Sequence, residues 1–490
     1  MPSTYVTVAI PYVNADPHLG YAYELVQADV FVRAHRQAGD RVRFLGGTDD
    51  YSLKNVLAAE LAGVPTRDFV DRHARRFEAL RAPLNLTFDD FIRTSADPRH
   101  RPAVERIWRA AFEAGDLYRR HYEGDYCVGC EQFYGDAEQV KGCCPEHRTP
   151  TERIAEENWF FRLSAYQVHI EELIASDRLA IRPEAFRNEA LSFVRAGLQD
   201  ISVSRSVDRA RGWGIPVPGD PSQVIYVWFD ALTNYISALG FGDPDSREYR
   251  DWWLQADERV HVIGKGILRF HAVYWPAFLR SAGQPPPTRI QVHPYLTVDG
   301  QKLSKSQGTT VRPDELVERY GTDTVRWFFA REVGEVSDTD FTIERLVDRA
   351  NEDLANGIGN VTNRIVTLLH RYCGGRVRRG AEPIAEAAGL RDSVRAAIVD
   401  FRLREAAGLV SDAVAALNRD LEVSQPWRIA KDPARVDELE AVLARQIATA
   451  QVIGTAIEPI VPSLAQRLLD QLGHGDAKLP EPTPAFARIE

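Results

Sequence analysis

Two pairs of side chains in the middle of the chain have the types and the spacing of metal ligands. Cys127 and Cys130 are separated by two residues, and so are Cys144 and His147. Such tight turns can each present two ligands at tetrahedral spacing, and thiolate and imidazole are the ligands that Zn²⁺ prefers in closed structural sites. Cys143 is left over, because Cys144 fits the CPEH turn better. The pattern predicts one structural zinc; reduced cysteines without metal are the alternative.

Two lysines further along the chain suit phosphate chemistry. Lys302 and Lys305 lie three residues apart in the serine- and glycine-containing segment DGQKLSKSQG (299–308). Two ammonium groups at this spacing can neutralise a polyphosphate and the charge that develops as it reacts. A solvated basic loop is the alternative, since charged residues are mostly found on protein surfaces.

A histidine and a glycine lie at the first predicted strand–helix junction. His18 and Gly20 follow the apolar run of residues 5–10 and precede a helical pattern. Backbone N–H groups and the helix dipole favour an anion at such a junction, and a glycine lets it approach the backbone closely. Taken alone, this motif is more often an ordinary histidine near a turn. Together with the lysine-containing loop, it indicates a site that handles phosphate groups.

The elements that must position these side chains alternate between strands and helices. The predicted order is a strand at 5–10, a helix at 20–38, a strand at 42–47, helices at 52–63 and 66–82, and later strands at 224–229, 260–265 and 290–298. Strand–helix alternation of this kind predicts a parallel sheet of the doubly wound type.

Two parts of the chain depart from that alternation. Residues 115–221 contain the cysteine cluster and turn-rich segments such as GWGIPVPGDPS, and we interpret them as an inserted domain. From about residue 345 to the end the periodicity is wholly helical and is punctuated by prolines, which predicts an α-helical bundle.

Composition limits the class of protein. The chain has 490 residues, of which 44% are hydrophobic and 27% charged, as in a globular protein of two to four domains. It has no apolar run of membrane-spanning length, and its first residues suit a core strand better than an export signal, so we expect a cytoplasmic protein. The net charge of −10 argues against diffuse nucleic-acid binding but permits a local basic face.

The segments HLGY and KLSKS resemble the HIGH and KMSKS signatures of class I aminoacyl-tRNA synthetases. The finer resemblance is to methionyl-tRNA synthetases, and it covers nearly the whole chain. The motifs that carry it are AIPYVNADPHLG (9–20), FLGGTDD (44–50), CVGC and CPEH, DISVSR (200–205), WGIPVP (213–218), YVWFDALTNY (226–235), VIGKGILRFHAVYWP (262–276), DGQKLSKSQGT, GNVTNR (359–364) and QPW (425–427).

This resemblance implies activation of L-methionine by ATP, with release of pyrophosphate, and transfer from methionyl-adenylate to the 3′ end of tRNA(Met). Catalysis would rest on alignment and on stabilisation of phosphate charge rather than on a protein nucleophile. The catalytic residues it implies are His18, Lys302 and Lys305, with Mg²⁺ accompanying ATP. The ATP-binding residues it implies are His18, Gly20, Tyr21, Gly264, Ile267, Lys302, Ser304 and Lys305.

The resemblance also implies a methionine pocket and an anticodon site. The pocket residues are Ile10, Tyr12, Asp49, Trp228, Ala231, Leu232, Tyr235, Ile267 and His271, with Asp49 opposite the α-ammonium group. Aromatic rings suit a thioether. The anticodon residues are Asn360, Arg364 and Trp427, which can stack on and hydrogen-bond to unstacked bases.

The expected fold is therefore α/β: a Rossmann-like parallel-sheet catalytic domain with an inserted zinc-knuckle connective domain, followed by an α-helical anticodon-binding bundle. The expected boundaries are 1–114 and 222–288 for the two halves of the catalytic domain, 115–221 for the insertion, 289–345 for a stem-contact region with the KLSKS loop, and 346–490 for the bundle. We expect a monomer.

Three positions depart from the family pattern, all at or near the predicted nucleotide site. Tyr21 replaces the final histidine of the HIGH-type motif, GGTDDYSLKN lacks the usual acidic-His-Gly continuation, and Gly266 replaces a commonly acidic residue. They leave a second hypothesis, a paralogue that transfers its aminoacyl-adenylate to a non-tRNA amine. A non-catalytic RNA-binding relative is a third, weaker hypothesis.

Overall fold

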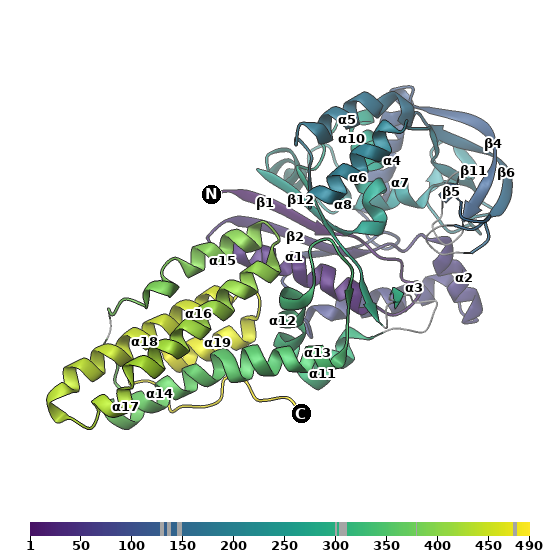
Figure 1. Cartoon of the computed structure of the whole chain (residues 1–490). Helices are drawn as coiled ribbons and strands as arrows, with labels where there is room; N and C mark the ends of the chain where they lie inside the picture. Colours follow the sequence, from purple (N-terminus) through teal and green to yellow (C-terminus); the bar gives the residue numbers. More distant parts are fainter. Residues whose placement is uncertain are drawn as a thin grey trace. The chain divides into compact units, whose positions relative to one another are not determined.

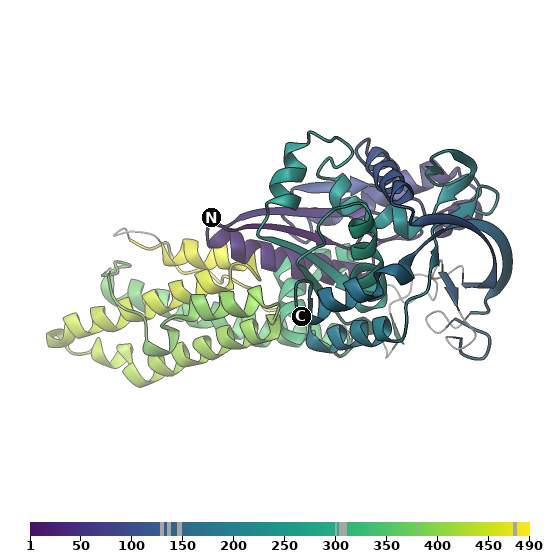
Figure 2. The same cartoon turned by 90° about the horizontal axis from the view of Figure 1, so that it is seen from above.

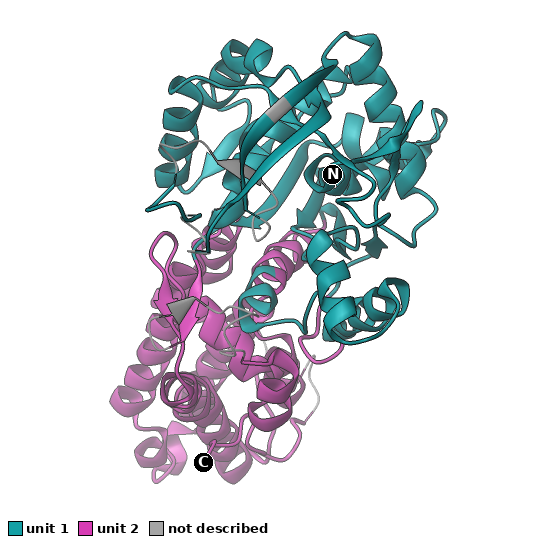
Figure 3. Ribbon diagram, turned by 90° about the vertical axis from the view of Figure 1, so that its right-hand side faces the viewer, with its two compact units in different colours: residues 1–24, 40–81, 87–294 teal, residues 25–39, 82–86, 295–490 magenta. Residues whose placement is uncertain are grey.

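The chain forms two compact units (Figure 3). Unit 1 comprises residues 1–24, 40–81 and 87–294, and unit 2 comprises residues 25–39, 82–86 and 295–490. The computed structural model describes residues 1–127, 132–134, 139–144, 149–298, 301–302, 311–378, 380–473 and 478–490.

The centre of unit 1 is a six-stranded sheet in the order β3-β2-β1-β12-β13-β7, with every neighbouring pair parallel (Figure 1). Its strands are β1 (Ser3–Val8), β2 (Arg41–Thr48), β3 (Asp90–Arg93), β7 (Ala180–Arg182), β12 (Glu258–Gly264) and β13 (Arg289–His293). Every residue of β1 is buried, as expected for a central parallel strand covered on both faces. The predicted parallel sheet is confirmed.

The strands of unit 1 alternate with helices, as predicted. These are α1 (Leu19–Gln37), whose first turns belong to unit 1, α2 (Leu53–Leu61), α3 (Thr66–Glu78), α4 (His100–Glu113), α5 (Gln167–Ala175), α6 (Glu184–Arg195), α7 (Val227–Leu232), α8 (Asn234–Ser237), α9 (Arg247–Tyr249) and α10 (Trp275–Ser281). Short 3₁₀ and π segments, η5 (Lys265–Ile267) and η6 (Phe270–Tyr274), follow β12.

Between α4 and α7 the chain builds two further sheets. A long antiparallel pair, β4 (Leu117–Cys127) and β6 (Glu152–Phe161), forms the arch visible in Figure 2, with β5 (Gln132–Tyr134) and β8 (Ile201–Ser202) beside it. A smaller sheet joins β9 (Ser204–Ser206), β10 (Pro216–Val217) and β11 (Asp220–Ile225). The segment also supplies β7, which pairs with β13 at the edge of the main sheet.

Two predicted strands end four or five residues earlier than expected, and the strand predicted at 5–10 ends two residues early, at Val8. β11 ends at Ile225 and the apolar run continues as helix α7, so the strand prediction for 224–229 is wrong beyond that residue. The reason is that a short, fully buried apolar run has no periodicity that separates strand from helix. β13 ends at His293 because Pro294 cannot donate to a ladder, and the run resumes in another sheet as β14 (Leu296–Val298).

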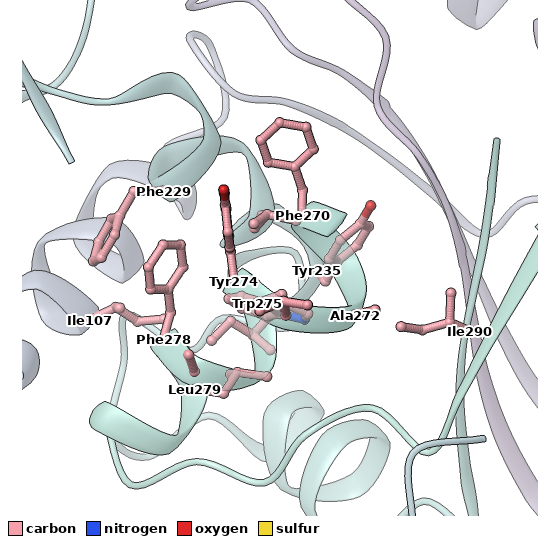
Figure 4. Close-up of a cluster of buried hydrophobic side chains, with 14 of the residues drawn as sticks. Ile107, Phe229, Tyr235, Phe270, Ala272, Tyr274, Trp275, Phe278, Leu279 and Ile290 are labelled. Atoms are coloured by element: carbon pink, nitrogen blue, oxygen red, sulfur yellow. The ribbon is translucent and has the colours of Figure 1, made fainter. Parts of the chain in front are cut away.

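The core of unit 1 lies between the helices and the main sheet (Figure 4). Ile107 of α4, Phe229 of α7 and Phe278 of α10 face one another there, and the rings of Phe229 and Phe278 lie 4.6 Å apart. Because α7 packs on both α4 and α10, the segment that carries the predicted methionine-pocket residues is held on two sides.

Unit 2 is mainly helical, as predicted for the C-terminal part of the chain. Its helices are α11 (Pro313–Tyr320), α12 (Thr322–Glu332), α13 (Ile343–Arg349), η7 (Ala350–Gly359), α14 (Asn360–Cys373), α15 (Leu390–Val399), α16 (Leu403–Ser424), α17 (Pro426–Ile429), α18 (Val436–Ile457) and α19 (Pro462–Leu472). The long helices α16 and α18 lie side by side in Figures 1 and 2. A small sheet joins β14, β15 (Gln301–Lys302) and β16 (Thr339–Asp340).

Among the residues that the structure describes, every helix is too short or too polar to cross a membrane.

A buried arginine ties three segments of unit 2 together. Arg326 of α12 is fully buried, and its guanidinium donates to the carbonyl oxygens of Leu84 (3.0 Å), Pro459 (3.0 Å) and Ile460 (2.8 Å). Its Nη2 also lies 2.8 Å from Oδ2 of Asp29, which is fully buried as well. The planar guanidinium suits this role, because its N–H donors satisfy several acceptors at once.

We expect Arg326→Met to lower the free energy of unfolding by about 3–5 kcal/mol, because it leaves the buried Asp29 carboxylate and three carbonyl groups short of donors. Chemical unfolding of the two proteins measures the difference. Arg312→Met is the control, since Arg312 forms exposed ion pairs with Asp314 and Glu315 and its loss should cost about 1 kcal/mol or less. Equal losses in both variants would contradict the assignment.

Candidate active site

Four of the residues predicted to bind substrates follow strands of the main sheet. Ile10 and Tyr12 follow β1, Asp49 follows β2, and Ile267 follows β12. Because these strands are parallel, their carboxyl ends share one edge of the sheet, which is where ligands of open α/β sheets bind. The fold therefore brings together residues that are far apart in the sequence.

His18 closes the first turn of α1. The Tyr21 N–H lies 3.0 Å from the carbonyl oxygen and 3.2 Å from Nδ1 of His18. With Nδ1 accepting, the neutral imidazole carries its proton on Nε2. A Cβ on Gly20 would lie 3.1 Å from Nδ1, a tight contact, so the glycine makes room for the ring.

The side chain of Tyr21 points into the protein. It is 6% exposed, its ring lies 5.4 Å from that of Phe77, and its hydroxyl donates to the Gly47 carbonyl at 3.4 Å. Burial raises the pKa of this phenol well above its usual value. The departure from the HIGH-type motif thus replaces an ionisable imidazole with a neutral group that packs between α1, β2 and α3.

Asp49 lies beside the segment that follows β1. It is 2% exposed, it forms an isolated parallel bridge with Tyr12, and its N–H donates to the Pro11 carbonyl. A Cβ on Gly47 would lie 2.9 Å from Cγ2 of Ile10 and 2.6 Å from a backbone oxygen, so only glycine permits this close approach. Ile10, Tyr12 and Asp49 are therefore neighbours, as predicted pocket residues should be.

The neighbouring Asp50 has a structural environment that the sequence did not reveal. It is fully buried and accepts hydrogen bonds from Thr48 (2.9 Å), Ser95 (2.7 Å) and Arg93 (3.2 Å). Burial raises the pKa of this carboxyl, and the Arg93 charge opposes the rise. Arg93 ends a strand that pairs with β2, and Ser95 lies just beyond it, so only the pairing of β2 with β3 identifies these two partners.

The residues on α7 and α8 meet those that follow β12. Trp228 stacks on Phe270 with centroids 3.8 Å apart and rings almost parallel. Tyr235 donates to Nε2 of His271 at 2.7 Å, and Nδ1 of His271 donates to the Ile267 carbonyl at 2.9 Å. Trp228, Tyr235, Ile267 and His271 are thus assembled, and Ala231 and Leu232 are buried on the same short helix as Trp228.

A second histidine behind this array was missed by the sequence analysis. His261 stacks on Tyr235 with centroids 4.1 Å apart, accepts from Trp275 at 3.2 Å and lies 2.6 Å from the Thr7 hydroxyl. Burial lowers the pKa of His261 well below its usual value and lowers the pKa of His271 to about 4. Both imidazoles are neutral near pH 7, and their tautomers are fixed by their partners.

Glu24 and His293 form another pair at the same edge that sequence reasoning missed. Glu24 accepts from the Ala9 N–H at 2.9 Å, and its second oxygen lies 3.0 Å from Nε2 of His293. Burial raises the pKa of this carboxyl, while His293 and the Ala9 and Gly264 N–H groups lower it. The pair connects the ends of β1, β12 and β13. Gly264, a predicted ATP-binding position, is the last residue of β12.

Several predicted residues lie outside the described residues. These are Ser304, Lys305, Cys130 and His147; Lys302 ends the backbone of β15. Of the predicted zinc ligands, Cys127 and Cys144 are described. Both are buried, at 1% and 0% exposure, and they pack against each other as a separate cluster. Two of the four predicted ligands are therefore close together.

In unit 2, the predicted anticodon residues lie on α14 and α17. Asn360 is exposed at the start of α14, and Arg364 follows one turn later. Arg364 forms a 2.6 Å ion pair with Glu422 near the end of α16, shortly before the half-exposed Trp427 of α17. The ion pair brings this arginine to the helix end that precedes the tryptophan.

The pKa of His271 predicts how the stability of unit 1 responds to acid. A histidine with a pKa of about 4 in the folded protein and about 6.5 when unfolded binds its proton only after unfolding, so stability falls as the pH drops from about 6 to about 4. His271→Gln should reduce this slope by up to about 1.4 kcal/mol per pH unit. Unfolding by denaturant at several pH values measures it, and an unchanged slope would contradict the buried neutral state.

Comparison with known proteins agrees with the resemblance drawn from the motifs. The family described as "tRNA synthetases class I (M)" matches residues 4–156 and 149–366. A Brucella suis protein named "Methionine--tRNA ligase" is 40% identical over 512 residues, covering 99% of this chain and 97% of that protein. A Mycobacterium tuberculosis protein of the same name is 39% identical over 518 residues, covering 99% and 98%.

Solved structures give the same result. The Mycobacterium tuberculosis methionyl-tRNA synthetase in complex with methionyl-adenylate is similar with a TM-score of 0.93 and 38% identity, covering 100% of both chains. The apo form of that enzyme gives a TM-score of 0.87 and 36% identity, covering 100% of this chain and 99% of the other. The chain therefore belongs to the class I methionyl-tRNA synthetase family.

Proposed function

We propose that the protein is a methionine–tRNA ligase, which activates L-methionine with ATP and transfers the methionyl group to tRNA(Met). The observation that carries the proposal is similarity to methionine–tRNA ligases over the whole chain, together with the close structural match to a relative that holds methionyl-adenylate. A transfer to a non-tRNA amine lacks support, since the full-length relatives are named as tRNA ligases.

The methionine side chain would lie against Trp228, Ala231, Leu232 and the Tyr235–His271 pair. Tyr235 donates its proton to His271, so its oxygen faces a thioether as an acceptor with no charge nearby. Burial keeps the imidazoles of both His271 and His261 neutral. An uncharged polarisable pocket suits sulfur, which gains from aromatic contacts and loses little by leaving water.

The polar end of methionine would lie at the ends of β1 and β2. Asp49 is bridged to Tyr12 along the sheet edge, and its burial would strengthen its attraction for an ammonium group. This leaves the substrate carboxylate toward the junction of β1 with α1, where it would attack the α-phosphorus of ATP. His18 would donate from Nε2 to a phosphate oxygen, because its Nδ1 is occupied by the Tyr21 N–H.

Lys302 and Lys305 would neutralise the charge on the triphosphate as pyrophosphate leaves. Mg²⁺ would supply further positive charge to the same phosphates. The remaining proposed ATP contacts are Gly20, Tyr21, Gly264, Ile267 and Ser304. Tyr21 cannot add positive charge near neutral pH, so among the predicted residues the two lysines would supply the positive charge, with His18 acting as a hydrogen-bond donor.

Asn360, Arg364 and Trp427 would read the anticodon. Trp427 would stack on an unstacked base, while Asn360 and Arg364 would contact base edges and phosphate. The Glu422 carboxylate holds Arg364 in place before tRNA arrives.

We expect methionine-dependent exchange between ATP and pyrophosphate, and charging of tRNA with a CAU anticodon. Trp427→Ala should raise the KM for tRNA about 5- to 100-fold, because one base–aromatic stack is lost, and should leave exchange unaffected. Trp252→Ala, at a half-exposed tryptophan that contacts Arg41 in unit 1, is the matched control. Exchange without charging would favour the amide ligase, and absence of exchange would leave only RNA binding.

The zinc knuckle remains part of the proposal. Cys127 and Cys144 support it, because two thiols buried against each other away from the main core suit deprotonated metal ligands. Cys130 and His147 would complete a closed tetrahedral set. Such a zinc would fix the turns that follow β4 and would take no part in the reaction.

We expect about one zinc per chain after purification without chelators, because four ligands close one tetrahedral site. Cys127→Ser should lose the metal, whereas Cys143→Ser should keep it, since Cys143 is the bystander. Elemental analysis of the three proteins decides. Absence of zinc from the unmodified protein, or equal loss in the two variants, would refute the site.

Two further parts of the proposal concern the cellular location and the oligomeric state of the enzyme. An enzyme that uses ATP, methionine and tRNA would work in the cytoplasm, where translation occurs. We expect it to act as a monomer, which light scattering of the purified protein measures directly.

A further inference from the structure

A buried serine–histidine–aspartate array lies beside the proposed methionine pocket. His100, the first residue of α4, has Nε2 2.5 Å from Oδ1 of Asp230 on α7 and Nδ1 2.8 Å from the hydroxyl of Ser237 on α8. All three side chains are at most 1% exposed. The proposed reaction assigns them no role.

The Ser237 hydroxyl has two hydrogen-bond acceptors within reach. It lies 2.8 Å from Nδ1 of His100 and 3.2 Å from the Asn234 carbonyl oxygen. Pairing a buried acid with a buried base avoids the cost of an isolated buried charge.

This arrangement is not that of a hydrolase. The serine hydroxyl is fully buried, so a substrate carbonyl cannot reach it for attack. The array is instead a connection between helices. It joins the start of α4 to α7 and α8, and the neighbouring Arg99 reinforces the connection by donating to the Ala238 carbonyl at 2.7 Å.

The carboxyl of Asp230 depends on His100. Within the described residues, its second oxygen is buried and has no hydrogen-bond donor. Burial raises the pKa of this carboxyl, and His100 opposes the rise. Asp230 lies between Trp228 and Ala231 on a helix of six residues, so a displacement of its carboxyl moves the wall of the pocket.

We propose that His100 is a positioning residue that, through Asp230, sets the methionine pocket in the geometry that binds substrate. The proposal rests on the proposed function and on the pocket assigned there. The hydrogen bond from His100 to Asp230 fixes the rotation of α7, and with it the indole of Trp228 and the small surface of Ala231. His100 touches no substrate.

The test is methionine-dependent ATP–pyrophosphate exchange by the whole protein. His100→Ala should lower kcat/KM for methionine about 10- to 100-fold through KM, the loss expected for a pocket wall displaced by a fraction of an ångström. The KM for ATP should stay unchanged, because α7 carries no proposed ATP contact. Equal changes in both KM values, or an unchanged KM for methionine, would overturn the proposal.

Conservative variants separate positioning from stability. The amide nitrogen of His100→Gln reaches the place of Nε2 and keeps the bond to Asp230, whereas that of His100→Asn reaches the place of Nδ1 and keeps only the bond to Ser237. The first should restore the KM for methionine and the second should not; equal values in both would overturn the proposal. If replacements at His100 prevent folding, two variants of Asp230 test the same hydrogen bond. Asp230→Asn, whose amide can donate to Nε2, should keep the KM for methionine unchanged, whereas Asp230→Ala should raise it. A raised KM in Asp230→Asn with an unchanged KM in Asp230→Ala would overturn the proposal.

Trp228→Ala distinguishes failure of the proposed pocket from failure of this inference. It should raise the KM for methionine, since its indole is a proposed wall of the pocket. If it does not, the pocket assignment is wrong and the positioning role falls with it. If it does and His100→Ala does not, only the positioning role fails.

Discussion

Parallel pairing of β1 with both β2 and β12 is the constraint on which the site depends. The register places Val8 beside Val262 and Thr7 beside Leu45, so the three strands end together although their residues are up to about 250 positions apart along the chain. Most of the proposed substrate-binding groups then belong to segments that leave the sheet at this edge. The sheet itself needs only buried apolar strands, and the chemistry lies in the segments that leave them.

The polar groups behind that edge are mostly neutral pairs. His261 and His271 are kept uncharged by burial, and their hydrogen bonds to Thr7, Trp275 and Tyr235 fix which nitrogen carries the proton. Such groups fix the directions of hydrogen bonds without adding charge.

In unit 2, a buried charged side chain rather than a sheet holds distant segments together. There, the buried guanidinium of Arg326 satisfies carbonyl groups from two distant turns, and Asp29 balances its charge. A hydrophobic contact could fill this volume but could not fix the direction of three carbonyl groups at once. Helix α14, which carries two of the proposed anticodon residues, is joined to α16 by an ion pair in the same unit.

The sequence by itself determined the family, the parallel sheet, the helical C-terminal part and the identities of the proposed site residues, because these are written in short motifs and in periodicity. It failed where a segment's state depends on its surroundings: residues 227–229 became helix rather than strand, since a short buried apolar run lacks a period. It also gave no indication that His100 meets Asp230 or that Glu24 meets His293, because those contacts join segments more than a hundred residues apart. Tyr21 illustrates the division best. Its type was visible in the sequence, but only the tertiary structure decided that its phenol packs inward on Phe77 and Gly47, since burial is a property of neighbours that the local sequence does not contain.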